Sequence, residues 1–549
     1  MIAHDSAPPS RTQDRPAADG RPPGRVVMLV DNDVARDSRV QKAARSTAAL
    51  GWDVTLLGVT SDATARWAVG DAVAQTYPVA PLPRPRRRDF RRSLRHPLAY
   101  PTPQHADHFG KLAQLRRTDR VFLAGARPVA PRTPRWAARK VTGLLRRVQD
   151  RWVAARVAQT AAKEAGHLRI TRRDALGYRL AGAVRGHRAW RSLEPYLWRY
   201  EVALGAAVDA LAPDIIHAND VRMLGVGARA VRRARLAGRE VALVWDAHEY
   251  LRGLRQPGAQ RRWLPAHLGY LEEYLPLADA VVTVSEPIAD LLQRDHQLAA
   301  RPLVVQNVPS VDRPVTDEDR RRYGDIRAAC GLGPDTPLLV YSGAAAAQRG
   351  IGNAVTALRL LPGAHLALVV GQSGPRYVAR VLEQAVRQGV RQRVHLASYV
   401  PHWYVPEFLS TADVGLIPLH HWPNHELSLI TKFFEYSHAR LPLVTSDVAT
   451  MAAMVQRTGQ GEVFAAEDCE DLARAVRAVL ADPARYRAAY DNPALLSRWT
   501  WEEEVQVLHQ LYARLRGVGA AAEAGVPVPG GRTPDRARAR VGAAAEPAE

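Results

Sequence analysis

Two consecutive series of short apolar runs constrain the fold of this chain more than any other feature. The runs of the first series span residues 25–31, 53–58, 214–217, 241–245, 280–285 and 303–307. Those of the second series span residues 338–341, 366–370, 394–396, 414–418 and 443–445. Helical patterns separate the runs, and continuous apolar strands are typical of parallel sheets that helices cover on both faces. The pattern predicts an α/β protein with two doubly wound, Rossmann-like parallel-sheet domains.

The length of 549 residues exceeds that of one ordinary domain, and changes in composition divide the chain into parts. We expect a disordered leader at 1–24, a first domain at 25–310, a linker at 311–327, a second domain at 328–498, a helix at 499–516 and a disordered tail at 517–549. The last helix would begin at Trp501 and carry three glutamates in its first turn, where acidic side chains complement the helix dipole.

A basic insertion interrupts the first domain at about residues 84–200. Its first run is Pro83-Arg-Pro-Arg-Arg-Arg88, and its later part carries an amphipathic helical pattern at 136–153 that mixes arginine with leucine and tryptophan. Such a helix can lie on an anionic membrane surface. The alternative is a solvated helix that covers the domain.

Composition limits the class of protein and its partners. The net charge of +21 favours anionic partners, although an Ala- and Arg-rich composition can also produce it. Two cysteines cannot form a disulfide framework, and no apolar run approaches the ~20 residues that span a bilayer. We therefore expect a cytoplasmic protein that can contact the inner face of a membrane, and we do not expect nucleic acid as its partner.

Small residues follow the first strand of the second domain. The loop runs from Gly343 through four alanines to Arg349 and Gly350, and a helix is expected to begin near Ile351. Small residues allow a ligand to approach the backbone, a helix N-terminus favours anions, and an arginine matches the geometry of a phosphate. A plain glycine-rich turn is the alternative reading of this loop.

A second candidate element is the segment Ser428-Leu-Ile-Thr-Lys-Phe-Phe-Glu-Tyr436, for which we expect a helix at 429–439. Lys432 and Glu435 are three residues apart and therefore share one helix face. The carboxylate can accept hydrogen bonds from ribose hydroxyls, and the ammonium can contact a diphosphate. An exposed Lys–Glu pair worth ~0.3 kcal/mol is the alternative.

Polar clusters also follow two strands of the first domain. His217 to Asp220 contains one cluster, and Asp246-Ala-His248-Glu249 contains the other. Polar residues at the carboxyl ends of parallel strands line the usual ligand crevice. Asp31-Asn-Asp33 and the Asp317-Glu-Asp319 of the linker resemble a metal-binding Asp-x-Asp, but we expect both to be structural.

These residues together resemble glycosyltransferase family 4, the retaining enzymes of the GT-B fold, over about residues 27–515. The most specific match is Lys432-Phe-Phe-Glu435-Tyr436 followed by Pro442. Arg349-Gly350 resembles the family's phosphate loop, Trp245-Asp-Ala-His248-Glu249 its cleft histidine segment, and Trp501-Glu502 the helix that crosses back to the first domain.

The resemblance implies two domains facing across a cleft and transfer of a sugar, with retention, from a nucleotide-sugar to a hydroxyl of a glycan or lipid-linked acceptor. It implies no cofactor and no metal. The implied catalytic residues are His248, Arg349 and Lys432. The implied donor-binding residues are Gly343, Gly350, Ser428, Leu429 and Glu435. The acceptor-side candidates are Asp37, Arg39, His217, Asp220 and Glu249.

One departure from the family pattern leaves alternatives open. The family motif has two glutamates separated by seven residues, but Leu427 occupies the first position here and Glu426 is one residue away. A sugar-nucleotide epimerase of the same fold would consume donor without accumulating a nucleoside diphosphate. A phosphorylase would need a pyridoxal-binding lysine, which we cannot identify. A catalytically degenerate basic protein that binds membrane or nucleic acid would bind no nucleotide.

Overall fold

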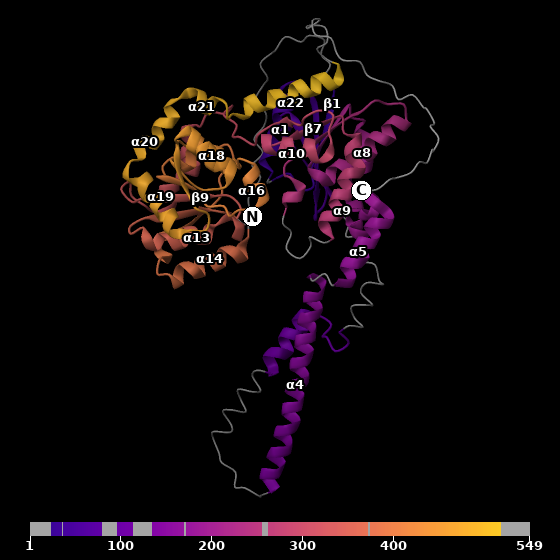
Figure 1. The fold of residues 1–549 in the computed structure, drawn as a ribbon, viewed down its shortest axis with the longest axis vertical. Helices are drawn as coiled ribbons and strands as arrows, with labels where there is room; N and C mark the ends of the chain where they lie inside the picture. Colours follow the sequence, from indigo (N-terminus) through magenta and orange to yellow (C-terminus); the bar gives the residue numbers. More distant parts are fainter. Residues whose placement is uncertain are drawn as a thin grey trace, which may run out of the picture.

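The computed structural model describes residues 23–79 except residue 36, and residues 96–113, 134–168, 172–254, 262–371 and 374–517. It confirms two α/β domains, each built on a parallel sheet, with helix α22 running over both (Figure 1). Most of the expected leader and tail lies outside the described residues.

The first domain contains an eight-stranded sheet in the order β3-β4-β2-β1-β5-β6-β7-β8. Its strands are β1 (Arg25–Leu29), β2 (Asp53–Thr60), β3 (Ala65–Val69), β4 (Ala72–Pro78), β5 (Ile215–Asn219), β6 (Ala242–Ala247), β7 (Ala280–Thr283) and β8 (Leu303–Val304). The helices around it include α1 (Ser38–Ala49), α7 (Trp198–Leu211), α8 (Asp220–Leu236), α9 (Trp263–Tyr274) and α10 (Glu286–His296). Only the β3–β4 pair is antiparallel among the pairs of this sheet, and we did not predict that hairpin, although Gly70-Asp71 between two alternating segments is its turn signal.

The second domain contains a six-stranded, fully parallel sheet in the order β11-β10-β9-β12-β13-β14. Its strands are β9 (Leu338–Ser342), β10 (His365–Val369), β11 (Val394–Ala397), β12 (Val414–Ile417), β13 (Leu443–Ser446) and β14 (Gly461–Phe464). Its helices include α13 (Ile351–Ala357), α14 (Pro375–Arg387), α16 (Pro423–Leu427), α17 (Thr431–His438), α18 (Ala449–Thr458), α19 (Cys469–Ala481), α20 (Pro483–Arg487) and α21 (Pro493–Ser497). The strand β14 was also not predicted.

Both strand orders reverse direction next to their first strand, between β1 and β5 and between β9 and β12. Ligands of open parallel sheets bind outside the carboxyl ends of the strands at such a point. The segments after β1, β5, β9 and β12, including the helices that follow, carry most of the predicted site residues. The topology therefore gathers them at the functional edge of each sheet.

The segment predicted as a linker contains the short helix α11 (Asp317–Tyr323) and the first residues of α12 (Ile326–Cys330). The side chains of Thr316 and Asp319 form a reciprocal capping box at the start of α11. Arg313 also donates to Asp319 at 2.9 Å. The Asp317-Glu-Asp319 pattern therefore serves the helix start, as expected for a structural element.

Helix α22 (Trp501–Arg516) connects the two domains. Its apolar residues Trp501, Val505, Leu508, Leu511 and Tyr512 belong to one buried cluster with strand residues of both sheets. Two glutamates in its first turn accept hydrogen bonds from residues 306–310, the segment that crosses from the first domain to the second. Glu502 accepts from Ser310 Oγ at 2.6 Å, and Glu504 accepts from the Gln306 amide at 2.8 Å.

The basic insertion contains α4 (Pro134–Leu168) and α5 (Arg172–Arg185), and α4 extends far from both domains (Figure 1). The helix predicted at 136–153 is therefore part of a longer one. Residues 96–113 pack against its second half, where Arg156 lies 3.9 Å from the centre of the Tyr100 ring. None of the described helices is long and apolar enough to cross a membrane.

The loop that ends at Gly350 tolerates no side chain at that residue. Gly350 has φ of +69°, and an added Cβ would lie 1.7 Å from the Pro418 carbonyl oxygen. We expect Gly350→Ala to lower the free energy of unfolding by about 2–4 kcal/mol, because backbone must move. The urea unfolding midpoint measures this. Gly333→Ala, in open space, should change it by less than ~0.5 kcal/mol, and equal effects of the two variants would contradict the prediction.

Candidate active site at the domain junction

The loops at the carboxyl ends of the two sheets are in contact. Ser285, after β7, donates from Oγ to the Leu427 carbonyl at 2.7 Å. Asn307, after β8, donates from Nδ2 to Thr431 Oγ1 at 2.9 Å, at the first residue of α17. The N-terminus of α17 therefore points to the first domain.

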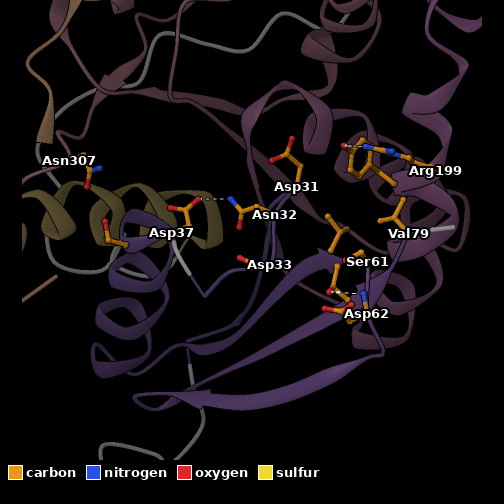
Figure 2. A pocket seen from close by; sticks show the side chains of 13 residues that line it. Asp31, Asn32, Asp33, Asp37, Ser61, Asp62, Val79, Arg199 and Asn307 are labelled. Atoms are coloured by element: carbon orange, nitrogen blue, oxygen red, sulfur yellow. Dashed lines mark hydrogen bonds between the residues drawn. The ribbon is translucent and has the colours of Figure 1, made fainter. Parts of the chain in front are cut away.

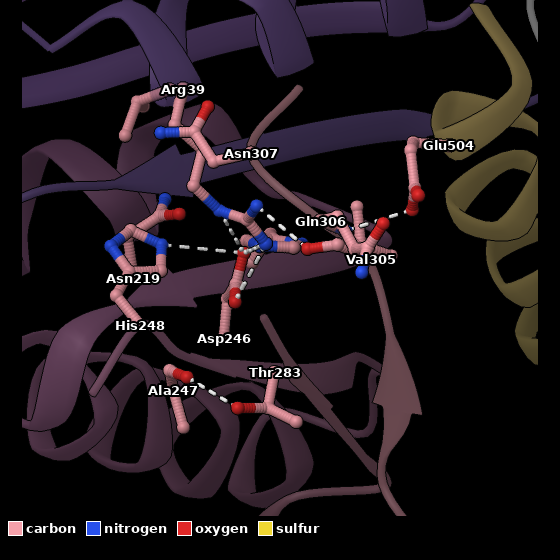
Figure 3. Close-up of polar contacts among 12 residues, drawn as sticks. Arg39, Asn219, Asp246, Ala247, His248, Thr283, Val305, Gln306, Asn307 and Glu504 are labelled. Atoms are coloured by element: carbon pink, nitrogen blue, oxygen red, sulfur yellow. Dashed lines mark hydrogen bonds and ion pairs between the residues drawn. The ribbon is translucent and has the colours of Figure 1, made fainter. Parts of the chain in front are cut away.

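A buried ion pair lies on the first-domain side of this junction (Figure 3). The Arg39 guanidinium donates to both oxygens of Asp246, at 2.8 Å to Oδ2 and 3.1 Å to Oδ1, and to the Val305 carbonyl at 2.8 Å. Arg39 and Asp246 are 4% and 2% exposed. Arg39, predicted on the acceptor side, thus fastens α1 to β6 and to the start of the interdomain crossing.

His248 lies between two carboxylates. Its Nε2 is 3.3 Å from Asp246 Oδ2, and its Nδ1 is 3.6 Å from Asp220 Oδ1. Burial alone would lower the pKa of this imidazole, but Asp220 and Asp246 outweigh burial and raise the pKa to about 9. The folded protein binds this proton more tightly than the unfolded chain does. The interaction of protonated His248 with its carboxylates therefore stabilises the fold fully below pH 6.5, and this stabilisation is lost as pH rises through about 9.

His217 connects the same carboxylate to helix α22. Its Nε2 is 3.5 Å from Asp246 Oδ2, and its Nδ1 is 2.7 Å from the Tyr512 hydroxyl. His217 is 1% exposed and Tyr512 is fully buried. His217, predicted on the acceptor side, therefore positions Asp246 and is covered by α22.

A polar pocket of about 790 Å³ opens in the first domain beside this network (Figure 2). It is lined by Asp31, Asn32, Asp33, Asp37, Ser38, Val59, Thr60, Ser61, Asp62, Val79, Arg199, Tyr200 and Asn307. Asp37 caps helix α1 and accepts from Asn32 Nδ2 at 2.8 Å. The structure thus brings one predicted acceptor-side residue, Asp37, into the lining.

Asp220 and Glu249 are the remaining acceptor-side candidates. Asp220 begins α8 with φ of +65°, an uncommon conformation for a residue with a Cβ, and burial raises its pKa to about 6. Burial also raises the pKa of Glu249, while His248 and Arg349 oppose that effect. The charge of Arg349 therefore acts across the domain junction.

Lys432 is the most unusual group on the second-domain side. The residue is 7% exposed, and its ammonium nitrogen has no hydrogen-bond acceptor within the described part of the chain. The nitrogen lies 3.4 Å from the centre of the Tyr341 ring and 3.5 Å from where a Cβ of Gly343 would be. Burial, together with Arg349, holds the pKa of Lys432 well below its ordinary 10.5.

Glu435 lies one turn further along α17. Burial raises its pKa to about 7, against the lowering effect of Lys42 and Lys432. Lys42 belongs to α1 of the first domain, where it donates to the Val308 carbonyl and to Asn307 Oδ1. Glu435 is therefore the carboxylate that the two lysines face from opposite domains.

The segment before α17 explains the departure from the family pattern. Leu427, at the first glutamate position, packs against the apolar core of the first domain. Glu426 faces away from Lys432, because it accepts from the Ala449 amide at 2.7 Å and pairs with His421 at 2.6 Å. Leu429 is 9% exposed. Glu426 thus does not replace the missing carboxylate.

Several junction residues were not predicted. They are Lys42, Asn307, Glu504 and Tyr512. Lys42 and Tyr512 sit on the buried faces of α1 and α22, where their spacing is that of ordinary core positions. Pairing across hundreds of residues leaves no local signal, so only a three-dimensional arrangement could have identified them.

The fold and this arrangement define a two-domain α/β protein of the GT-B class. Residues 153–308 match the model of Glycosyltransferase Family 4, and residues 336–482 match that of Glycosyl transferases group 1. The chain belongs to this family of glycosyltransferases.

Curated relatives of the chain are also glycosyltransferases. It is 26% identical to an alpha-D-kanosaminyltransferase of Streptomyces kanamyceticus over 40% of this chain and 55% of that one. It is 28% identical to a D-inositol 3-phosphate glycosyltransferase of Xylanimonas cellulosilytica over 44% of this chain and 58% of that one. The chain thus spans about half the length of these curated relatives. A sucrose-phosphate synthase of Thermosynechococcus elongatus has the same fold, with a TM-score of 0.59 at 17% identity over 90% of this chain and 100% of that one.

The link between α22 and the site can be tested at Tyr512. Removing its hydroxyl leaves the buried His217 Nδ1 without a partner, so Tyr512→Phe should lower the free energy of unfolding by about 1–3 kcal/mol. Chemical denaturation measures this value. Tyr77→Phe is the matched control, because the described residues offer no hydrogen-bond partner to its hydroxyl, and it should cost less than ~0.5 kcal/mol. Equal stability of Tyr512→Phe and the native chain would contradict the role given to this contact.

Proposed function

We propose that this chain transfers a sugar from a nucleoside-diphosphate sugar to an acceptor hydroxyl, with retention of configuration. One observation carries the proposal: the buried Lys432 ammonium has no acceptor, faces the Gly343 loop and lies one helical turn from Glu435. A buried cation without an anion is unfavourable. The site is therefore incomplete until an anionic ligand arrives.

A diphosphate fits this requirement better than a single negative charge. Arg349 lies close enough to depress the pKa of Lys432, so two cationic side chains converge on one place. Together they would stabilise the charge that develops on the leaving diphosphate, and Gly343 leaves room for the backbone to approach it. The same two cations would stabilise this charge as a metal ion otherwise could, so we propose no metal ion for the reaction.

Glu435 would hold the ribose of the donor. Its carboxylate has no hydrogen-bond donor among the described residues, and two ribose hydroxyls can supply them. The ribose contact would favour the ionised form and lower the pKa from about 7. Ser428 and Leu429 precede α17 and would contribute backbone groups to the same ligand.

The acceptor would occupy the polar pocket of the first domain. His248, held between two carboxylates, would contact the donor sugar where the acceptor hydroxyl attacks. Hydroxyls of a glycan or of a lipid-linked sugar match a lining of carboxylates, amides and hydroxyls. We infer a role in cell-envelope glycan, extracellular polysaccharide or glycolipid synthesis on the cytoplasmic side of a membrane.

A nucleotide screen by thermal shift tests the donor site. At about 100 times its dissociation constant, the matching nucleotide among UDP, GDP and ADP should stabilise the protein by ~2.7 kcal/mol. Glu435→Ala should lose most of that shift, whereas Glu383→Ala, at an exposed residue of α14, should keep it. If folded protein responds to no nucleotide, the transferase is excluded in favour of a degenerate binding protein. Consumption of the nucleotide-sugar without release of a nucleoside diphosphate would indicate an epimerase.

The depressed pKa of Lys432 predicts proton uptake on binding. A bound diphosphate stabilises the ammonium and raises its pKa, so the nucleotide should bind with uptake of a proton, and its affinity should fall as pH rises. Calorimetry at pH ~8.5 in two buffers of different ionisation enthalpy measures this, because Glu435, with a pKa of about 7, is already ionised there.

Lys432→Met should abolish the uptake and reduce turnover by about 10²–10³-fold. The matched control is Lys111→Met, at an exposed lysine paired with Asp107 on the insertion, which should change neither quantity. Proton uptake that persists in Lys432→Met would assign it to another group.

A further inference from the structure

Helix α4 carries an exposed apolar stripe. Val141, Leu144, Leu145, Val148 and Trp152 are 58%, 59%, 63%, 59% and 51% exposed. At about 100° per residue, these five side chains fall within an arc of about 100° on one face of the helix. The spacing is that of an apolar helix face that normally packs against a core, yet no core among the described residues covers it.

Positive charge flanks this stripe. Arg147 and Arg151 lie along one side of it, whereas Arg146 lies toward the opposite face, and all three are exposed. Asp150 lies on the opposite face of the helix and is buried. Among residues 141–164 of the described chain, the exposed charges are those three arginines and, at the far end, Glu164.

Helix α5 repeats the arrangement. Leu176, Leu180 and Val184 recur every four residues and are 68%, 64% and 75% exposed, with Arg179 beside them. The two helices together carry eight large apolar side chains in water. Soluble surfaces rarely show apolar groups gathered in this way without a binding role. Helix α4 extends away from both domains (Figure 1), and the exposed side chains of its stripe could meet a broad surface.

We propose that the exposed faces of α4 and α5 dock this protein on a lipid bilayer that contains anionic headgroups. The apolar stripe would enter the boundary between headgroups and acyl chains, while Arg147 and Arg151 reach the lipid phosphates beside it. This surface is separate from the domain junction. The inference goes beyond the proposed transfer reaction and adds where that reaction would take place.

Charge and shape argue against two other occupants. A second copy of the chain packed stripe to stripe would bring its arginines against those of the first copy, and like charges at close range are unfavourable. Nucleic acid would satisfy the arginines but would leave the leucines and valines in water. A bilayer satisfies both kinds of side chain at once.

Vesicle co-sedimentation of the full chain tests the proposal. The probes are phosphatidylcholine vesicles with and without about 30% phosphatidylglycerol. The native chain should bind the anionic vesicles at least about tenfold more tightly. The triple variant Leu144→Gln, Leu145→Gln, Val148→Gln should lose about tenfold or more of that affinity. The matched control is Val202→Gln, Leu236→Gln, Val386→Gln, at exposed apolar residues of α7, α8 and α14, and it should bind as the native chain does.

A second variant separates charge from apolar contact. Arg146→Gln, Arg147→Gln, Arg151→Gln should remove the preference for anionic vesicles. Native binding by the stripe variant, or no vesicle binding by the native chain, would overturn the proposal. A native chain that is a dimer, and that the stripe variant converts to a monomer, would also overturn it. The same holds if the arginine variant no longer binds duplex DNA but still binds vesicles. All variants should retain the nucleotide thermal shift, so a failed membrane surface is distinguishable from a failed donor site.

Discussion

The carboxylate of Asp246 is the group on which the junction depends. It is buried, and Arg39, His217 and His248 all converge on it from α1, β5 and the loop after β6. A buried ion pair is weak evidence for stability, because desolvation offsets much of its Coulomb energy, but breaking it by removing one partner costs about 3–5 kcal/mol. These contacts of Asp246 therefore fix the positions of α1, β5 and the loop after β6 more than they add to the free energy of unfolding. Through Val305 and Tyr512 it also determines where the crossing segment and helix α22 meet the first domain.

The second domain uses the opposite arrangement. Asp246 has two cationic partners, Arg39 and His248, whereas the buried Lys432 has no hydrogen-bond acceptor among the described residues, and no described residue donates to Glu435. Their charges lie near one another, but neither is neutralised by a direct contact, so burial moves both pKa values toward the neutral forms. A protein retains such groups when a ligand completes them. One side of the junction is thus satisfied before binding, and the other is left for the donor.

Sequence patterns predicted the fold class and placed most candidate site residues near strand ends, because strand periodicity and strand-end polarity are local properties. They failed where the determining contact is distant. The pairing of Tyr512 with His217 joins residues 295 positions apart, and Tyr512 looks like an ordinary core residue of α22. The burial of Arg39 could not be read from Asp37-Ser-Arg39 either, since its partner lies on another strand. The strands β3 and β14 were missed for a different reason: both are edge strands, and a charged residue interrupts the apolar run of each.

The two unusual features of the molecule follow one physical rule. A buried cation without an anion and an exposed apolar helix without a core both raise the free energy of the isolated protein. Neither is needed to fold the sheets, since α4 and α5 lie outside them and α17 could carry an apolar residue in place of Lys432. Each becomes favourable only with a partner of complementary chemistry, a diphosphate for Lys432 and a bilayer for the α4 stripe. In that arrangement the stripe would set where the protein is held, while the junction would set what is transferred there.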